Sequence, residues 1–266
     1  MNRQLAAGFT LIEIAVVLFI FGLLIAGLLG PLETQLEARD RAATIETMDQ
    51  IIESLYGYAI TNGRLPCPDT NGDGLPNPVF NAAVPATATC TGEGFIPWVE
   101  LNAPQGDAWG NRFRYRIRSP HFAMPETDGI CNGNTAAVPE FDLCVTGDIV
   151  VTTRGDNPAT TPAIEGKAAL NLAQGLPAVI VSHGRNGFGA TSITGVLRAA
   201  PPVSNADEIE NADGDITFLT RIFTGENGGC ADDTDETTSL CEYDDIVKWI
   251  SPALLNNRMV VAGQLP

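Results

Sequence analysis

The chain has 266 residues, of which 32 are acidic and 15 basic, so its formal net charge is -17. Such a surface repels the phosphate backbone, which argues against nucleic acid as a partner. One local set of alternating arginines could form a basic patch, but the polar face of a strand also explains it. The set consists of Arg112, Arg114, Arg116 and Arg118. The length fits a leader, an anchor and one globular head of about two hundred residues.

The N-terminal part of the chain holds a long apolar run with one charge near its start. Residues 14–30 are wholly apolar, and together with residues 9–12 they predict a helix that crosses a hydrocarbon core of about 30 Å. Glu13 is the single charge in this helix. Because placing a carboxylate inside a membrane costs free energy, we expect Glu13 to have a functional partner that compensates its charge. Arg3 precedes the run, which predicts a cytoplasmic N-terminus and an exported head.

The segment Gly8-Phe9-Thr10-Leu11-Ile12-Glu13, after a short leader, resembles the cleavage and methylation signature of type IV prepilins. The resemblance implies that a prepilin peptidase cuts between Gly8 and Phe9 and methylates the new amino group of Phe9. Glu13 then lies one helical turn from Phe9, where it would neutralise the amino group of a neighbouring subunit. A plain signal anchor is an alternative, and so is a secretory signal, although no small-residue cleavage site follows the run.

The pattern and the resemblance together divide the chain into four parts. We expect a leader at 1–8, a transmembrane and filament-core helix at 9–30, an amphipathic continuation at 31–62 and a head at 63–266.

The continuation carries an apolar stripe that a sheet of the head is expected to cover. Pro31 predicts a bend, and Asn62-Gly63 predicts the end of the helix. The stripe recurs at mostly three- and four-residue steps: Leu32, Leu36, Ala43, Ile45, Met48, Ile52, Leu55 and Ala59.

Short apolar or alternating runs in the head predict strands, separated by segments rich in Pro, Gly, Asn and Asp. The expected strands cover 112–117, 148–152, 178–182 and 216–219, and 157–162 is expected to be a loop. The predicted fold is α+β and pilin-like: a long N-terminal helix packed on a small antiparallel sheet with disulfide-tied loops.

The chain contains six cysteines and no CxxC or histidine-rich spacing, which favours disulfides in an oxidising compartment over zinc. We expect neighbours to pair in order, because each pair brackets a loop rich in Gly, Asp or Pro. Each bond would stabilise the head by about 2–4 kcal/mol. The candidates are Cys67, Cys90, Cys131, Cys144, Cys230 and Cys241.

A second resemblance lies in the head. Asp107-Ala108-Trp109-Gly110-Asn111 is similar to a segment of the major pseudopilins of type II secretion. In that family a turn like Ser182-His183-Gly184-Arg185-Asn186-Gly187 follows, and then an acidic calcium loop whose closing pair resembles Asp244-Asp245. Here about 55 residues separate the turn from the pair, where the family has a short loop.

Calcium is the one cofactor that the sequence supports. Asp69, Asn71 and Asp73 place oxygen ligands at alternate positions before a glycine, like the front half of an EF-hand loop. Phe80 stands where the closing glutamate belongs, which excludes a true EF-hand. A solvated Asp-Gly turn is the alternative. Further candidate ligands are Asp213, Asp215, Asp244 and Asp245.

The histidines, His121 and His183, lie in no catalytic or metal-binding spacing, and the chain has no P-loop. We therefore expect no enzyme but a minor structural subunit of a type IV pilus or a secretion pseudopilus. The resemblance implies other pilin subunits, a prepilin peptidase and an inner-membrane assembly platform as partners. It places the protein in the inner membrane, with its head in the periplasm, and then in a filament. An enlarged adhesive head, or a membrane-anchored periplasmic binding protein or enzyme, is the alternative.

Overall fold

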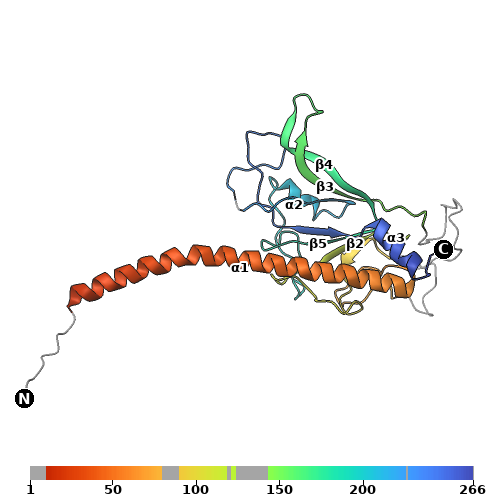
Figure 1. The fold of residues 1–266 in the computed structure, drawn as a ribbon, viewed down its shortest axis with the longest axis horizontal. Coiled ribbons are helices and arrows are strands. Elements are labelled where there is room, and N and C mark those ends of the chain that lie inside the picture. Colours follow the sequence, from red (N-terminus) through yellow and green to blue (C-terminus); the bar gives the residue numbers. More distant parts are fainter. Residues whose placement is uncertain (1–9, 80–89, 119–120, 124–142, 226, 266) are drawn as a thin grey trace, which may run out of the picture. The chain divides into compact units, whose positions relative to one another are not determined.

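The computed structural model describes residues 10–79, 90–118, 121–123, 143–225 and 227–265, and only the backbone of residues 26–33. The chain divides into two compact units, Met1–Ala43 and Thr44–Pro266. Figure 1 shows the fold and labels most of its elements.

Helix α1 covers Leu11–Asn62 and continues through Pro31 without interruption. It ends where the sequence predicts. Gly63 has a φ of +69°, a left-handed conformation that glycine adopts without strain, and its N–H donates to the carbonyl of Ala59 at 2.8 Å.

In the first unit, every large apolar side chain from Leu11 to Ile25 is at least 50% exposed. Among the residues described, no helix has a stretch that is both long and apolar enough to span a membrane. The predicted transmembrane segment 9–30 includes residues outside those described, and it stays a prediction.

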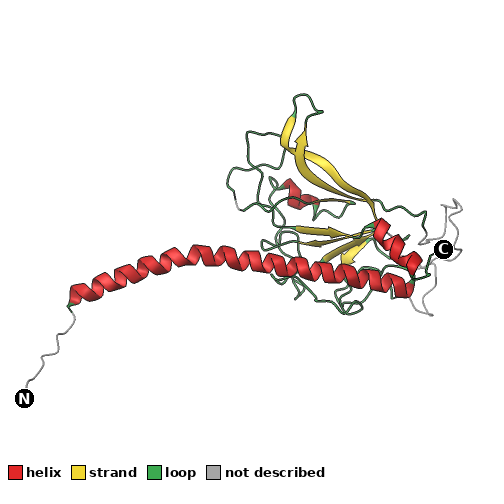
Figure 2. Ribbon diagram, in the orientation of Figure 1, coloured by secondary structure: helices red, strands yellow, loops and turns green. Residues whose placement is uncertain are grey.

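The second unit contains a four-stranded antiparallel sheet, shown in yellow behind the helix in Figure 2. Its strands, in spatial order, are β1 (Glu93–Phe95), β2 (Arg114–Ile117), β5 (Ala178–Ser182) and β7 (Ile246–Trp249). The predicted antiparallel sheet is thus present. Strands β1 and β7 are too short and too weakly patterned to have been predicted.

The helix packs on this sheet through the later part of the predicted stripe, together with Ile51, which the stripe did not include, while Leu36 of the stripe is 49% exposed. Met48, Leu55 and Ala59 are fully buried, in one cluster with Tyr115 of β2 and Ile180 of β5. A C-terminal helix, α3 (Pro252–Val261), adds two further side chains to this first core, Leu255 and Met259.

A second sheet, which the sequence analysis did not anticipate, has the order β4-β3-β6. Strands β3 (Ile149–Asn157) and β4 (Ile164–Leu176) form an antiparallel hairpin, while β6 (Thr217–Leu219) pairs with β3 in parallel. The expectation of one small antiparallel sheet is therefore corrected to two sheets, one of them mixed. The predicted loop at 157–162 lies at the tip of the hairpin.

Strand β5 is buried on both faces, so it separates two cores. Ala178 and Ile180 point into the first core, while Val179 and Val181 point into a second. This alternation follows from the two-residue period of a strand. The second core is small and consists of Ile149, Val151, Leu176, Val179, Val181, Phe218 and Val247.

Two of the predicted disulfides are formed, Cys67–Cys90 and Cys230–Cys241, with Cα atoms 5.6 and 4.9 Å apart. Cys144 is also disulfide-bonded. Its predicted partner, Cys131, lies outside the described residues.

Candidate functional site

At the N-terminus, Thr10 and Glu13 form a reciprocal capping box at the start of α1. The backbone N–H and the hydroxyl of Thr10 each donate to Oε2 of Glu13 at 2.8 Å, and the N–H of Glu13 donates to the Thr10 hydroxyl at 3.3 Å. This satisfies donors that a helix start leaves open. The T-x-x-E spacing is visible in the sequence, although Glu13 was predicted only as an assembly residue. Gly8 and Phe9 lie outside the described residues.

In the head, the two segments of the second resemblance bind each other. The Ser182 hydroxyl donates to Oδ2 of Asp107 at 2.7 Å, across 75 residues of chain. The amide of Asn111 donates to the carbonyl of Gly184 at 3.0 Å. The other Asp107 oxygen accepts the N–H groups of Trp109 and Asn111. Burial raises the pKa of Asp107, and these hydrogen bonds oppose that rise.

The predicted acidic pair, Asp244 and Asp245, joins a third carboxylate in a buried cluster. Glu208 comes from the short helix α2 (Ala206–Glu210), and one oxygen of each acid lies within 4.8 Å of the others. The 182–187 turn holds this acidic cluster in place. The side-chain amide of Asn186 donates to both oxygens of Glu208, at 2.9 and 3.1 Å, and its backbone N–H donates to Asp244 at 2.8 Å.

Burial and mutual repulsion control the charge of the acidic cluster. Burial, with the nearby charge of Asp245, raises the pKa of Glu208 to about 8. Burial also raises the pKa of Asp244 to about 7, and hydrogen bonds from the turn partly oppose it. One oxygen of Asp245 accepts from Asn211 at 2.8 Å, while the other is buried and has no hydrogen bond to any residue that the structure describes. Buried carboxylates of this kind suit a hard cation such as calcium, which prefers oxygen ligands.

Glu208 was missed by the sequence analysis. It lies 36 residues before Asp244, and no spacing rule links them. His183 was predicted to be a turn residue. Its Nδ1 lies 3.6 Å from Oδ1 of Asp245, the oxygen that accepts no hydrogen bond from the described residues. Neither nitrogen of the buried His183 ring has a hydrogen-bond partner among the described residues.

The predicted ligands at the start of the head form a self-contained turn. The buried carboxylate of Asp69 accepts the N–H groups of Asn71, Gly72 and Gly74 at 2.7–3.1 Å. The amide of Asn71 donates to Asp73 at 2.9 Å. These bonds occupy the oxygens with backbone donors and fit the alternative of an Asp-Gly turn.

Asp213 and Asp215 likewise accept backbone N–H groups, those of Asp215 and Thr217. Within the described ranges, the acidic cluster of Glu208, Asp244 and Asp245 is the only group of three potential metal-ligating His, Cys, Asp or Glu side chains. Calcium binding by Asp69, Asn71, Asp73, Asp213 or Asp215 stays a prediction.

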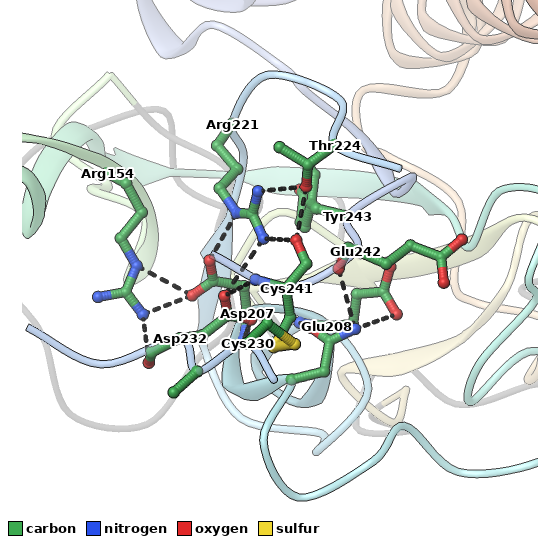
Figure 3. Close-up of polar contacts among 12 residues, drawn as sticks. Arg154, Asp207, Glu208, Arg221, Thr224, Cys230, Asp232, Cys241, Glu242 and Tyr243 are labelled. Carbon is green, nitrogen blue, oxygen red and sulfur yellow. Dashed lines mark hydrogen bonds and ion pairs between the residues drawn. A yellow bond between two sulfur atoms is a disulfide. The ribbon is translucent and has the colours of Figure 1, made fainter. Parts of the chain in front are cut away.

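The insertion between the turn and the acidic pair is anchored by a buried ion-pair network (Figure 3). Asp207 accepts from Arg154 at 2.5 Å and from Arg221 at 2.6 Å. Asp232 accepts from Arg221 at 3.4 Å and from the N–H of Cys241 at 2.8 Å. The disulfide of Cys241 closes the loop beside these pairs.

The alternating arginines lie along β2 as the strand interpretation predicts. Arg114 and Arg116 both pair with Glu93 of β1, and Arg116 does so at 3.0 Å. Arg118, just after the strand, pairs with Asp148 at 3.0 Å. These three arginines therefore serve contacts within the head.

Comparison with known proteins bears on the N-terminus. Residues 3–29 match the model of the prokaryotic N-terminal methylation motif. Neither the curated proteins nor the solved structures contain a match to this chain. The family match covers the segment with Gly8, Phe9 and Glu13, so the chain carries the prepilin-type cleavage and methylation signal.

Proposed function

We propose that this protein is a minor structural subunit of a type IV pilus or of a type II secretion pseudopilus, and not an enzyme. The observation that carries the proposal is the methylation motif at residues 3–29. In this proposal a prepilin peptidase cuts between Gly8 and Phe9 and methylates Phe9. An inner-membrane platform then assembles the subunit with other pilins.

The exposed apolar surface of α1 supports this role. All large apolar side chains from Leu11 to Ile25 are exposed, so this surface needs a lipid or protein environment. Before assembly, this apolar surface holds the subunit in the inner membrane, with its head in the periplasm. On assembly, the subunit buries this apolar surface in a filament. In this proposal, Phe9 directly precedes Thr10 in the sequence, and its new amino group pairs with Glu13 of a neighbouring subunit after cleavage.

The N-terminus of the purified protein tests the proposal. Mass spectrometry should find N-methylated Phe9 as the first residue. Intact Met1, or any other first residue, would contradict the processing. In sheared filaments, Glu13→Gln should be depleted, because its charge no longer compensates the amino group. Glu46→Gln, an exposed acid of the same helix, is the matched control and should assemble normally.

The two filament systems make different predictions. The contact between Asp107 and Ser182 joins the segments that resemble major pseudopilins, and it favours the secretion system. The anchored insertion enlarges the head and favours a minor pilin that makes surface contacts. Loss of protein secretion in a deletion strain would support the first system, and loss of attachment the second.

We also propose that Glu208, Asp244 and Asp245 hold a calcium ion. The support is their burial together, with an Asp245 oxygen that lacks a hydrogen bond. Calorimetric titration should show calcium binding that Glu208→Gln weakens and Asp213→Asn leaves unchanged. Magnesium should bind more weakly, because it demands octahedral geometry and keeps its water. Equal affinity of the two variants would contradict this site.

A further inference from the structure

The head contains an open cavity of about 420 Å³ that the filament role does not use. It lies beside β1 and β2, and its wall is half polar and half apolar. The side chains that matter here are Glu93, Phe95, Arg112, Arg114, His183 and Thr191. The volume falls in the range of sites for small organic molecules.

Arg112 is the unusual group in this wall. It is only 9% exposed, yet no ion pair joins it to a carboxylate of the described residues. Its two terminal nitrogens donate to neutral carbonyls, of Gly72 at 3.1 Å and of Ile193 at 3.2 Å. Its Nε is buried and has no hydrogen-bond partner in the part of the chain that the structure describes. A buried charge normally has a counter-charge, because burial without one is costly.

The guanidinium of Arg112 is held in a fixed place. Its central carbon lies 5.2 Å from the ring centres of both Phe95 and Trp98. A guanidinium has five N–H donors, and the two bonds to Gly72 and Ile193 use two of them. Because Nε is buried, the second N–H of each terminal nitrogen remains for a ligand, which gives two donors.

The surrounding charges add to the positive character of the cavity. Glu93 accepts from both Arg114 and Arg116, so one carboxylate serves two arginines. Among the lining residues, the two arginines Arg112 and Arg114 face one carboxylate, Glu93, in a chain whose net charge is -17. His183 closes another side of the wall, and its ring nitrogens have no hydrogen bond among the described residues.

We propose that this cavity binds a small organic molecule that carries one carboxylate, such as a sugar acid. The carboxylate binds the remaining N–H groups of the terminal nitrogens of Arg112, and Thr191 contacts a neighbouring hydroxyl. A monoanion fits better than a dianion such as phosphate, because Glu93 lines the same wall and Asp245 lies behind His183. The apolar half of the wall, with Phe95, covers the body of the ligand.

Calorimetry on the full-length protein in a neutral detergent tests the proposal. Sodium glucuronate is the probe, and glucose is its uncharged counterpart. Acetate supplies a carboxylate without a sugar, and phosphate supplies a dianion. Glucuronate should bind saturably, and glucose should bind at least about tenfold more weakly, because it lacks the charge-assisted hydrogen bonds.

The variant Arg112→Gln should weaken glucuronate binding by about tenfold or more. Arg118→Gln is the matched control, because Arg118 follows the same strand but pairs with Asp148 outside the cavity lining. It should leave binding unchanged. Equal effects of the two variants, or no saturable binding of glucuronate to the unchanged protein, would overturn the proposal.

Two further outcomes decide the ligand class. If acetate binds as tightly as glucuronate, the result supports a ligand that is recognised by its carboxylate alone. If phosphate binds more tightly than glucuronate, the result overturns the proposal that the ligand is a monoanion. If Arg112→Gln does not fold, the comparison of glucuronate with glucose still decides, since equal affinities would overturn the proposal. Prepilin processing at Phe9 is measured separately, so failure of either proposal leaves the other standing.

Discussion

The two faces of β5 lead into cores that are held together in different ways. On one face, α1, α3 and the four-stranded sheet bury a large apolar cluster that includes Met48, Leu55 and Tyr115. On the other face, the apolar cluster is small, and ion pairs and a disulfide hold the insertion around it. The first region is thus built by apolar burial, which needs little directional precision. The second depends on specific polar bonds.

This difference matters because buried ion pairs and apolar contacts respond differently to change. An apolar core tolerates substitutions of similar volume. A buried ion pair that loses one partner leaves an uncompensated charge, and the loss then exceeds the original gain. The insertion should therefore be the more fragile region.

The largest effect is expected at Asp207, because its carboxylate compensates both Arg154 and Arg221. Asp207→Asn should lower the free energy of unfolding by about 3–5 kcal/mol. Chemical denaturation of the full-length protein measures this. Asp49→Asn is the matched control: it breaks an exposed pair with Lys248 and should cost less than about 1 kcal/mol. Equal losses would contradict the comparison.

A smaller effect is expected when the insertion loses its disulfide. The double variant Cys230→Ser and Cys241→Ser opens a loop with a separation of 11 residues, which should cost about 2–3 kcal/mol. Hydrogen exchange should then rise in the insertion while the amides of Tyr115 and Ile180 stay protected. Uniform loss of protection would show that the two regions unfold as one.

The acidic cluster should make stability depend on pH. Because the pKa of Glu208 is raised from 4.5 to about 8, the folded protein binds more protons than the unfolded chain between these values. Asp244 acts in the same direction. The contribution of the acidic cluster to stability without calcium is therefore greatest below pH 4.5, falls as pH rises, and by pH 8 should be lower by on the order of 2 kcal/mol.

Chemical denaturation at pH 4.5 and at pH 8, once with a chelator and once with calcium, measures how the free energy of unfolding depends on pH. Calcium should flatten it by neutralising the cluster, and Glu208→Gln should flatten it without calcium. A dependence that survives in Glu208→Gln would place its origin elsewhere.

The smallest effect is expected at the surface of the first core. Glu53 accepts from Arg258 at 2.6 Å, but its side chain is 61% exposed. Glu53→Gln should change the free energy of unfolding by less than about 1 kcal/mol, which thermal unfolding can check against Glu46→Gln. A larger loss would show that the first region also depends on ion pairs.

The sequence predicted those parts of the fold that local pattern determines. The end of α1 at Asn62 follows from the Asn-Gly signal, and β5 follows from an uninterrupted apolar run. Strand β4 was missed because Ala168–Gln174 is rich in good helix formers. Its conformation depends instead on pairing with β3, and on Lys167, whose ammonium group donates to carbonyls of the insertion at Ala231 and Asp235.

The sites show the same division. The capping box of Thr10 and Glu13 was within reach of the sequence, since a fixed local spacing carries it. Glu208 and Arg112 were not, because their roles depend on neighbours far away in the chain. Burial is what distinguishes Arg112 from the paired arginines of β2, and no local pattern predicts burial without a partner.

The first core has a consequence for the order of folding. It joins Met48, near the end of α1, to Met259, a few residues from the C-terminus. A chain that emerges from its N-terminus can cover the apolar face of α1 with β2 and β5 first, but it completes this core only when α3 has appeared. A truncation before α3 removes residues 252–266 and leaves this face without Leu255 and Met259. Loss of this short segment should therefore destabilise a core that begins about two hundred residues earlier in the chain.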